Sequence, residues 1–269
     1  MRALKRTILI LLVVLSAAYI GTRIYQGSST RKEPPTIDCP AGILEVSAHD
    51  DESVLLTGVT AKDPQDGDLT KQIIIGGISK LISKDTAKVT LMVFDSDHNM
   101  GKVVRYIRYT DYQRPQFAIT KPLSFSSKSD VSLLKRLKAK DVLEGDISDR
   151  IRVSTLATTD NSEIYDITIQ VTNSMGDTAW LQLPVLVQES NPLRPVIELK
   201  EYLVYLSEGD SFSANDYLSQ MLVAGVSMDS SMVSIESNVD TAKTGTYRVL
   251  YSYSSNGITG MAILTVVVQ

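Results

Sequence analysis

The chain has 269 residues and a formal net charge of −4, which is enough length for two or three domains. Its ordinary apolar content argues against intrinsic disorder. Six of the 27 basic residues and none of the 31 acidic residues fall within residues 1–32, so residues 33–269 carry a net charge of −10, which disfavours binding to nucleic acid.

The N-terminal region combines basic residues with an uncharged apolar run that begins at Thr7. We expect residues 1–6 to form a short cytoplasmic segment and residues 7–25 a transmembrane signal-anchor helix, because about 20 mainly apolar residues span a bilayer. Basic residues on the short N-terminal side predict a single-pass membrane protein with its N-terminus in the cytoplasm and its C-terminal domains outside. A cleaved secretory signal is the alternative, with a small-residue cleavage site at Ser16-Ala17-Ala18. Residues 26–33 read as a polar linker.

The remainder of the chain repeats itself. Three prolines that precede alternating apolar residues, Pro35, Pro115 and Pro195, lie 80 residues apart. At a shift of 78 residues, "LLTGVTAKDPQDGDLT" (55–70) matches "LLKRLKAKDVLEGDIS" (133–148). Such self-similarity is typical of a duplicated structural unit. It predicts three domains, at residues 34–113, 114–193 and 194–269.

Each predicted domain ends in two alternating apolar–polar runs around a turn. The turns lie at Asp95–Gly101, at Asn173–Gly176 and at Ser255–Gly257. Period-two alternation on both sides of a Gly, Asn or Asp turn indicates a β-hairpin, and repeated short strands indicate a sandwich. The predicted fold class is therefore all-β, with three tandem sandwiches after the N-terminal helix.

These repeated motifs resemble a known family. The opening proline, the pattern D-x-x-D-G-D-L-T at 63–70 and the pattern G-T-Y-R-V-x-Y at 245–251 are similar to bacterial immunoglobulin-like (Ig-like) domains of the type first described in a pesticidal crystal protein. The resemblance covers residues 34–269 as three copies. It implies Ig-like β-sandwiches that serve as spacers, stalks or binding modules on bacterial surface proteins, and it implies no shared catalytic residues.

The acidic motif of the first copy permits two interpretations. Asp63, Asp66 and Asp68 could supply oxygen ligands for calcium, with Gly67 at the sharp turn. The same residue types also build tight turns without any metal. The turn is favoured, because the motif lacks the spacing and the closing glutamate of a 12-residue calcium loop. Calcium stays the alternative, and no other cofactor is expected.

Other candidate sites are weak. Asp95, Asp97, His98 and Asn99 read as a solvated hairpin turn rather than a metal site, and no catalytic motif surrounds either histidine, so the chain is not expected to be an enzyme. Trp180 lies in an alternating strand and is expected to be half-buried, with a sugar-stacking platform as the alternative. The single cysteine, Cys39, excludes an internal disulfide, and its place in the repeat predicts a buried side chain.

We therefore expect a non-enzymatic cell-surface stalk or adhesion module that binds a surface protein or a glycan and no nucleic acid. The alternative is a structural subunit of a larger cell-envelope assembly that docks to neighbouring proteins, and an exported hydrolase is a distant third. The sequence leaves the ligand and the oligomeric state open, because the loops of a sandwich carry specificity and their composition here is generic.

Overall fold

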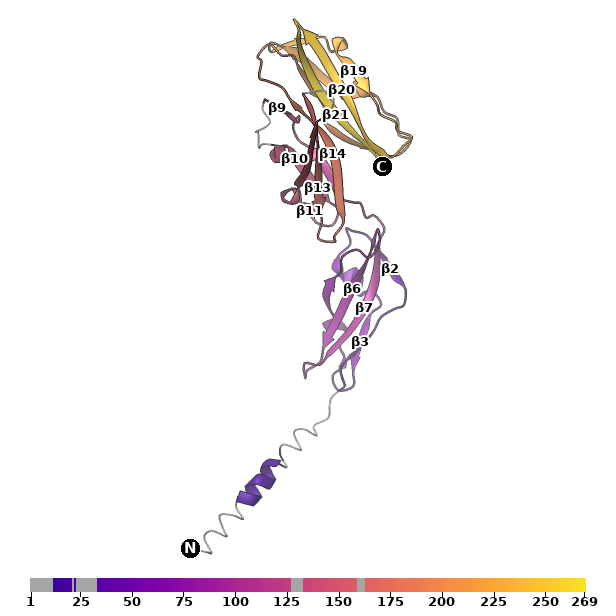
Figure 1. Ribbon diagram of the computed structural model, residues 1–269. Coiled ribbons are helices and arrows are strands. Elements are labelled where there is room, and N and C mark those ends of the chain that lie inside the picture. Colours follow the sequence, from indigo (N-terminus) through magenta and orange to yellow (C-terminus); the bar gives the residue numbers. More distant parts are fainter. Residues whose placement is uncertain (1–11, 21, 23–32, 127–132, 159–162) are drawn as a thin grey trace, which may run out of the picture. The chain divides into compact units, whose positions relative to one another are not determined.

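The computed structural model describes residues 12–20, 22, 33–126, 133–158 and 163–269. Its strands form six sheets in three pairs, and each pair combines a three-stranded with a four-stranded sheet (Figure 1). The all-β prediction and the tandem Ig-like sandwiches are confirmed at this level. We call the pairs sandwich 1, sandwich 2 and sandwich 3, in chain order.

Sandwich 1 pairs the sheet β1-β3-β4 with the sheet β2-β7-β6-β5. The bounds are β1 Thr36–Asp38, β2 Ile43–Val46, β3 Thr60–Asp63, β4 Gly67–Asp68, β5 Ile74–Ile78, β6 Thr86–Phe94 and β7 Met100–Tyr109, with 3-10 helices η1 Glu52–Leu56 and η2 Thr70–Gln72.

Sandwich 2 repeats this plan with the sheets β11-β10-β8 and β12-β13-β14-β9. The bounds are β8 Gln116–Ile119, β9 Ser124–Phe125, β10 Leu137–Asp141, β11 Gly145–Asp146, β12 Arg152–Thr158, β13 Ile164–Thr172 and β14 Thr178–Val187, with 3-10 helices η3 Leu133–Arg136 and η4 Ser148–Arg150.

Sandwich 3 consists of the sheets β15-β17-β18 and β16-β21-β20-β19. The bounds are β15 Val196–Leu199, β16 Leu203–Leu206, β17 Leu218–Val223, β18 Val226–Met228, β19 Ser234–Ser237, β20 Gly245–Ser255 and β21 Ile258–Val268, with 3-10 helices η5 Ala214–Tyr217 and η6 Ser230–Met232.

Strand alternation builds the three cores. In β6, every second residue from Ala87 to Val93 is fully buried, whereas the intervening residues face outward. This is the pattern of a sheet with one covered face. In sandwich 2, Phe117 and Ala139 of one sheet share a buried cluster with Ile169 and Leu183 of the other, so the two sheets pack face to face.

The opening prolines have a structural role in the first and third copies. A Cβ atom at Gly101 would lie 2.2 Å from the carbonyl oxygen of Pro35, and one at Gly260 would lie 2.0 Å from that of Pro195. In both copies, the chain entering the sandwich therefore runs against the start of the last strand, where only glycine leaves room. Pro35 and Pro195 thus mark the same packing contact in their sandwiches.

By its contacts, the chain forms two compact units. The first unit comprises the described residues up to Val46 together with Asp50–Arg108, and the second comprises Ser47–His49 and Tyr109–Gln269. Sandwiches 2 and 3 therefore belong to one unit. Within it, the Phe117 N–H donates to the Tyr205 hydroxyl (2.9 Å), and Leu203 belongs to the core cluster of sandwich 2.

The outer faces of sandwiches 2 and 3 meet in a small apolar cluster. Ile164 and Leu186 of sandwich 2 are buried together with Ile263 of sandwich 3. Leu250 and Met261 pack against this cluster. The joint between the last two predicted domains is consequently a packed interface.

The N-terminal prediction requires a correction. Of the predicted anchor, residues 12–20 and 22 are helical, and the rest lies outside the described residues. No helix among the described residues is long and apolar enough to cross a membrane. This finding contradicts the predicted single-pass anchor and the membrane localisation that was based on it.

Candidate functional site

The acidic stretch at 63–70 forms the turn that joins β3 to β4. The Asp63 carboxylate accepts hydrogen bonds through Oδ1 from the backbone N–H groups of Gln65 (2.7 Å) and Asp66 (2.8 Å). Gly67 has a φ of +77°, a conformation that favours glycine. The Asp68 carboxylate accepts from the Thr70 N–H at 2.9 Å, and hydrogen bonding by Thr70 holds the pKa of Asp68 below its ordinary value. The turn interpretation is therefore confirmed.

The three candidate metal ligands serve different partners. Asp63 holds its own turn, and Asp68 accepts from the Thr70 N–H at the start of η2. Both oxygens of Asp66 accept from Ser96, at 2.5 Å from its N–H and 2.9 Å from its hydroxyl. Ser96 lies in the β6–β7 loop, so Asp66 ties the acidic turn to this hairpin. Within the described part of the chain, no group of three or more His, Cys, Asp or Glu side chains is arranged to hold a metal ion. Calcium binding by these residues stays a prediction.

Sandwich 2 builds the same pair of loops. Asp141 Oδ1 accepts from the N–H groups of Leu143 (2.9 Å) and Glu144 (3.1 Å), as Asp63 does in sandwich 1. Glu144 accepts from the Ser174 N–H at 2.5 Å, as Asp66 does from Ser96. The sequence reasoning missed this contact between loops. The signal was present, because the 78-residue shift that superposes the acidic motifs also superposes Asp95–Asn99 on Asn173–Asp177.

In sandwich 2, the contact between the loops extends into a closed polar network. The Asn173 side chain donates through Nδ2 to Asp141 Oδ2 and to the Tyr112 hydroxyl, both at 2.9 Å. Asp177 accepts from the Tyr112 hydroxyl at 3.0 Å and forms an ion pair with Arg114 at 3.2 Å. Burial, above all, raises the pKa of Tyr112 well above its ordinary value. Every side chain in this network has a partner, so it stabilises the start of sandwich 2.

Trp180 is the most conspicuous surface residue of sandwich 2. The structure places it on the outer face of β14 with 74% of its surface exposed, so the expectation of a half-buried tryptophan was wrong. It pairs across the sheet with Gln170, which in turn pairs with Arg152 on the edge strand β12. All three side chains are exposed, and they form a row across three strands that we call the Trp180 row. Thr172 and Thr178, whose hydroxyls are hydrogen-bonded at 2.8 Å, lie beside it.

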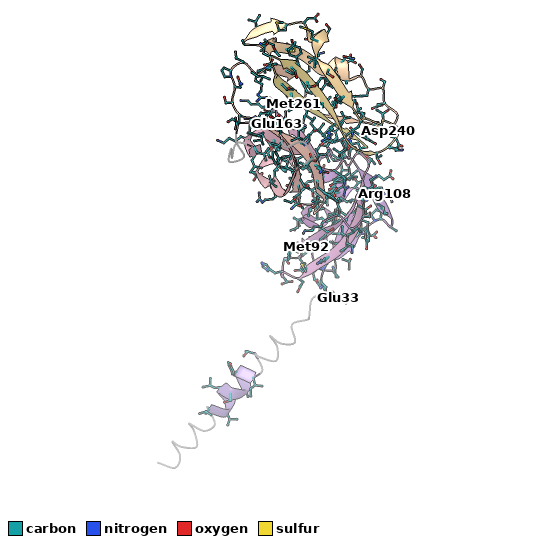
Figure 2. All side chains as sticks on the ribbon, turned by 45° about the horizontal axis from the view of Figure 1, so that its top comes forward. Glu33, Met92, Arg108, Glu163, Asp240 and Met261 are labelled. Carbon is teal, nitrogen blue, oxygen red and sulfur yellow. The ribbon has the colours of Figure 1, made fainter. Side chains whose placement is uncertain are left out.

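The outer face of sandwich 1 has a different chemistry. Its exposed apolar side chains include those of Ile74 (48%), Phe94 (42%), Met100 (46%) and Val104 (43%), on neighbouring strands. Met92 and Arg108 lie toward opposite ends of this face (Figure 2). Lys102 lies between Met100 and Val104 on this face of β7, so the exposed apolar side chains are interspersed with polar ones.

A cavity of about 210 Å³ lies where sandwiches 2 and 3 meet. Ile119, Leu186, Tyr202 and Ile263 contribute to its mainly apolar lining. Small-molecule sites usually measure 300–1,000 Å³. Arg194, the charged residue at its edge, already donates to the carbonyl oxygens of Thr259 (2.5 Å) and Glu189 (3.4 Å). The cavity therefore reads as imperfect packing at the interface.

Cys39 differs from its prediction as well. Its side chain is partly exposed, because β1 ends one residue earlier at Asp38 and the chain leaves the sheet there. The position is covered better in sandwich 3, where Leu199 lies within β15 and is 6% exposed. The expectation of a buried thiol is therefore not met.

Comparison with known proteins gives few relatives. No family model matches the chain. An uncharacterized 81.3 kDa protein of Acholeplasma phage L2 is 27% identical over 175 residues, which cover 63% of this chain and 22% of the phage protein. The chain thus spans about a fifth of the length of this relative.

Similar solved structures include CBM51-2 in complex with GlcNAc and INT domains from Clostridium perfringens ZmpB, at a TM-score of 0.24 and 18% identity over 55% of this chain and 26% of that chain. Drosophila N-cadherin EC1-4 follows with a TM-score of 0.21 and 15% identity, over 89% of this chain and 76% of that chain. Human CDH23 EC21-23 has a TM-score of 0.22 and 11% identity, over 87% of this chain and all of that chain. None of these structures is a domain of the pesticidal-crystal-protein type. At such TM-scores, the similarity gives no information beyond the fold described above.

Proposed function

We propose that this protein is a non-enzymatic binding module of the adhesion type and that sandwich 2 binds a glycan through the Trp180 row. The observation that carries the proposal is the 74% exposure of Trp180 on the outer face of β14. The finer relation to Ig-like modules of the pesticidal-crystal-protein type is part of the proposal and rests on the repeated motifs.

The chemistry of the row favours a sugar. An exposed indole offers a rigid apolar plane for the C–H face of a pyranose, and it loses little conformational entropy on binding. Gln170 adds a planar donor and an acceptor beside Trp180. Arg152, whose Nη1 already donates to the carbonyl oxygens of Asp149 and Ile151, adds its remaining guanidinium donors. A strand surface holds these side chains at fixed spacing, so the site is formed before the ligand arrives.

Glycan binding can be tested with the full chain and immobilised oligosaccharides, followed by titration calorimetry with each hit. Tryptophan anchors commonly contribute 2 kcal/mol or more, so Trp180→Ala should weaken binding by roughly 30-fold. Tyr106→Ala is the matched control, because this tyrosine is 41% exposed on the outer face of sandwich 1. Unchanged affinity in Trp180→Ala, or the absence of any glycan hit, contradicts the proposal.

The second candidate function is that of a structural subunit, and the apolar outer face of sandwich 1 favours it. Val104 and Ile263 occupy equivalent places, three residues after the glycines that meet Pro35 and Pro195. At Ile263, the outer face is covered by sandwich 2. Because sandwich 2 covers the equivalent face of sandwich 3, we propose that another Ig-like sandwich covers the face around Val104. We assign that sandwich to a second copy of this chain.

Light scattering coupled to size-exclusion chromatography tests the subunit function. The wild-type chain should dimerise as its concentration rises, and Val104→Lys should abolish the dimer, because a buried unpaired charge opposes the contact. Trp180→Ala should leave the dimer intact. A strictly monomeric wild-type chain at high concentration contradicts this candidate and leaves the glycan test unaffected.

A further inference from the structure

We propose that the glycan-binding surface of sandwich 2 continues from Trp180 into a cleft between sandwiches 2 and 3, and that it binds a neutral oligosaccharide of several sugar units. The cleft has a volume of about 120 Å³, and we call it the Arg248 cleft after one of its lining residues. This inference rests on the proposed glycan function and deepens it. It names the class of glycan and assigns part of the binding site to sandwich 3.

The first step of the argument is that the Trp180 row and the cleft share one face of two strands. On β14, Trp180, Gln182 and Pro184 alternate with buried residues, so all three lie on the outer face. On β13, Thr168 pairs with Gln182. Asp166 pairs with Pro184 in the row after that. Asp166, Gln182 and Pro184 line the cleft, which therefore begins about 13 Å or less from Trp180 along the strand.

The second step is that sandwich 3 forms the other wall of the cleft. Thr265 of β21 also lines it and is only 2% exposed, and its neighbour on β16, Leu203, belongs to the core cluster of sandwich 2. Arg248 pairs with Thr265 but is exposed, so it lies at the rim of the covered surface. Asn238 Oδ1 accepts from the Arg248 N–H at 2.9 Å, which fixes the backbone of this rim.

The third step is that the charged groups of the cleft are available to a ligand. In the part of the chain that the structure describes, the Asp166 carboxylate and the Arg248 guanidinium make no hydrogen bond or ion pair, either with each other or with other groups. Asn238 accepts through Oδ1, which leaves its Nδ2 as a further donor. The cleft therefore offers an anionic acceptor and several donors at the same time.

This combination of groups favours a neutral sugar. A carboxylate accepts from hydroxyl groups, a guanidinium donates to oxygen atoms, and a hydroxyl-rich ring satisfies both. The charges of Asp166 and Arg248 are opposite, so an uncharged ligand adds no unbalanced charge to the cleft. An acidic sugar would reach Arg248 only beside the Asp166 carboxylate, and like charges that meet at an interface oppose binding.

The dimensions favour a chain of several units over a single sugar. Complete small-molecule sites usually measure about 300–1,000 Å³, so the Arg248 cleft can take only one end of a ligand. The Trp180 row lies on the same sheet face and offers a stacking surface for another unit. An oligosaccharide that lies along β14 reaches both places, whereas a monosaccharide reaches one of them.

The experiment is a titration of the full chain with defined oligosaccharides of one to six units. The probes are neutral hexose and N-acetylhexosamine chains, together with the same chains ending in a uronic acid. Trp180 is the single tryptophan of the chain, so its fluorescence reports binding at the row directly. Affinity for the neutral chains should rise roughly tenfold or more from one unit to four, because hydrogen bonds to charged groups form only with the longer chains.

Two variants remove the groups that the cleft contributes. Asp166→Ala and Arg248→Ala should each abolish most of the gain in affinity with chain length and should leave the fluorescence response to single sugars unchanged. Lys140→Ala is the matched control, since it removes one exposed charge from β10 in the other sheet of sandwich 2. It should bind every chain like the wild type. A gain with length that persists in both cleft variants, or that is lost equally in Lys140→Ala, overturns the inference.

The outcomes separate this inference from the function on which it rests. A fluorescence response that depends on a sugar but not on chain length overturns the Arg248 cleft and leaves the Trp180 site standing. Tighter binding of the uronic acid chains than of the neutral chains overturns the assigned class of glycan. No response to any chain overturns the cleft together with the glycan function.

Discussion

Sandwich 1 and sandwich 2 build the same pair of loops, yet one arrangement is closed and the other is not. In sandwich 2, Asn173 connects Asp141 to Tyr112, so the buried groups satisfy one another. In sandwich 1, Asp95 stands at the equivalent place and accepts through Oδ2 from Asn99 Nδ2 at 2.7 Å, while Asp63 Oδ2 is left without a hydrogen-bond partner. The two copies therefore share the backbone conformation of these loops. A single difference between an amide and a carboxylate side chain determines whether all the buried polar groups are hydrogen-bonded.

The largest expected effect comes from removing the central carboxylate of each copy. Asp141 is 1% exposed and accepts three hydrogen bonds, so Asp141→Ala should cost about 3 kcal/mol of unfolding free energy. Asp63→Ala also removes an unsatisfied buried oxygen, so it should cost only about 1 kcal/mol. Urea unfolding, with hydrogen exchange to identify the affected sandwich, measures both losses. Equal losses of unfolding free energy in the two variants would contradict the difference in hydrogen bonding between sandwiches 1 and 2.

The entry of the chain into each sandwich allows a second comparison. Gly101 has no room for a Cβ beside the Pro35 carbonyl, whereas sandwich 2 has Ala179 at the equivalent position. Gly101→Ala should therefore cost about 2 kcal/mol through overpacking. Ala179→Gly should cost about 1 kcal/mol through added chain entropy. Thermal unfolding of both variants measures these costs, and a neutral Gly101→Ala contradicts the packing role of the proline.

Alkaline pH should affect sandwich 2 through its network. The pKa of Tyr112 is raised in the folded state, chiefly by burial, so its contribution is fully present below the unfolded value of 10 and is lost as the pH rises above it. With allowance for partial exposure, the loss should be about 1 kcal/mol at pH 11. Tyr112→Phe should flatten the decline between pH 9 and pH 11 in a series of urea titrations. The pKa of Tyr251 is also raised, to about 12, chiefly by burial. The unfolding free energy of Tyr112→Phe should therefore still decline slightly with pH.

The smallest effect concerns the acidic residue that joins the two loops. Burial acts to raise the pKa of Glu144, but hydrogen bonds from Arg150 and Ser174 outweigh it and lower the pKa below 4.5. The resulting stabilisation is present above the unfolded pKa and is lost as the pH falls through the lower pKa of the folded state. Because the pair with Arg150 is solvent-accessible, Glu144→Gln should cost only about 0.5 kcal/mol at pH 7. The variant and the wild type should converge near pH 3, and a difference that persists there contradicts an ionic cause.

Local patterns in the sequence were sufficient for the secondary structure of this protein. The period-two alternation of Ala87–Val93, the turn residues of the hairpins and the Asp-Gly-Asp turns all act over a few residues, so they can be read without knowledge of the rest of the fold. The 78-residue shift then established that sandwich 2 repeats the plan of sandwich 1. The all-β class and the acidic turn followed from this information. The N-terminal run was misjudged, because apolar composition alone does not establish a spanning helix.

The tertiary structure decided which surfaces are covered and which loops meet. Alternation places Trp180 and Ile263 alike on outer faces of their sheets, yet Ile263 is buried against sandwich 2 and Trp180 is exposed. The contact of Asp66 with Ser96 joins residues 30 positions apart, and Asp63 Oδ2 is buried without a hydrogen-bond partner, whereas the amide of Asn173 donates to the equivalent Asp141 Oδ2 in sandwich 2. The physical reason is that a strand pattern fixes which side chains share a face, whereas burial and hydrogen bonding depend on what packs against that face from elsewhere in the chain.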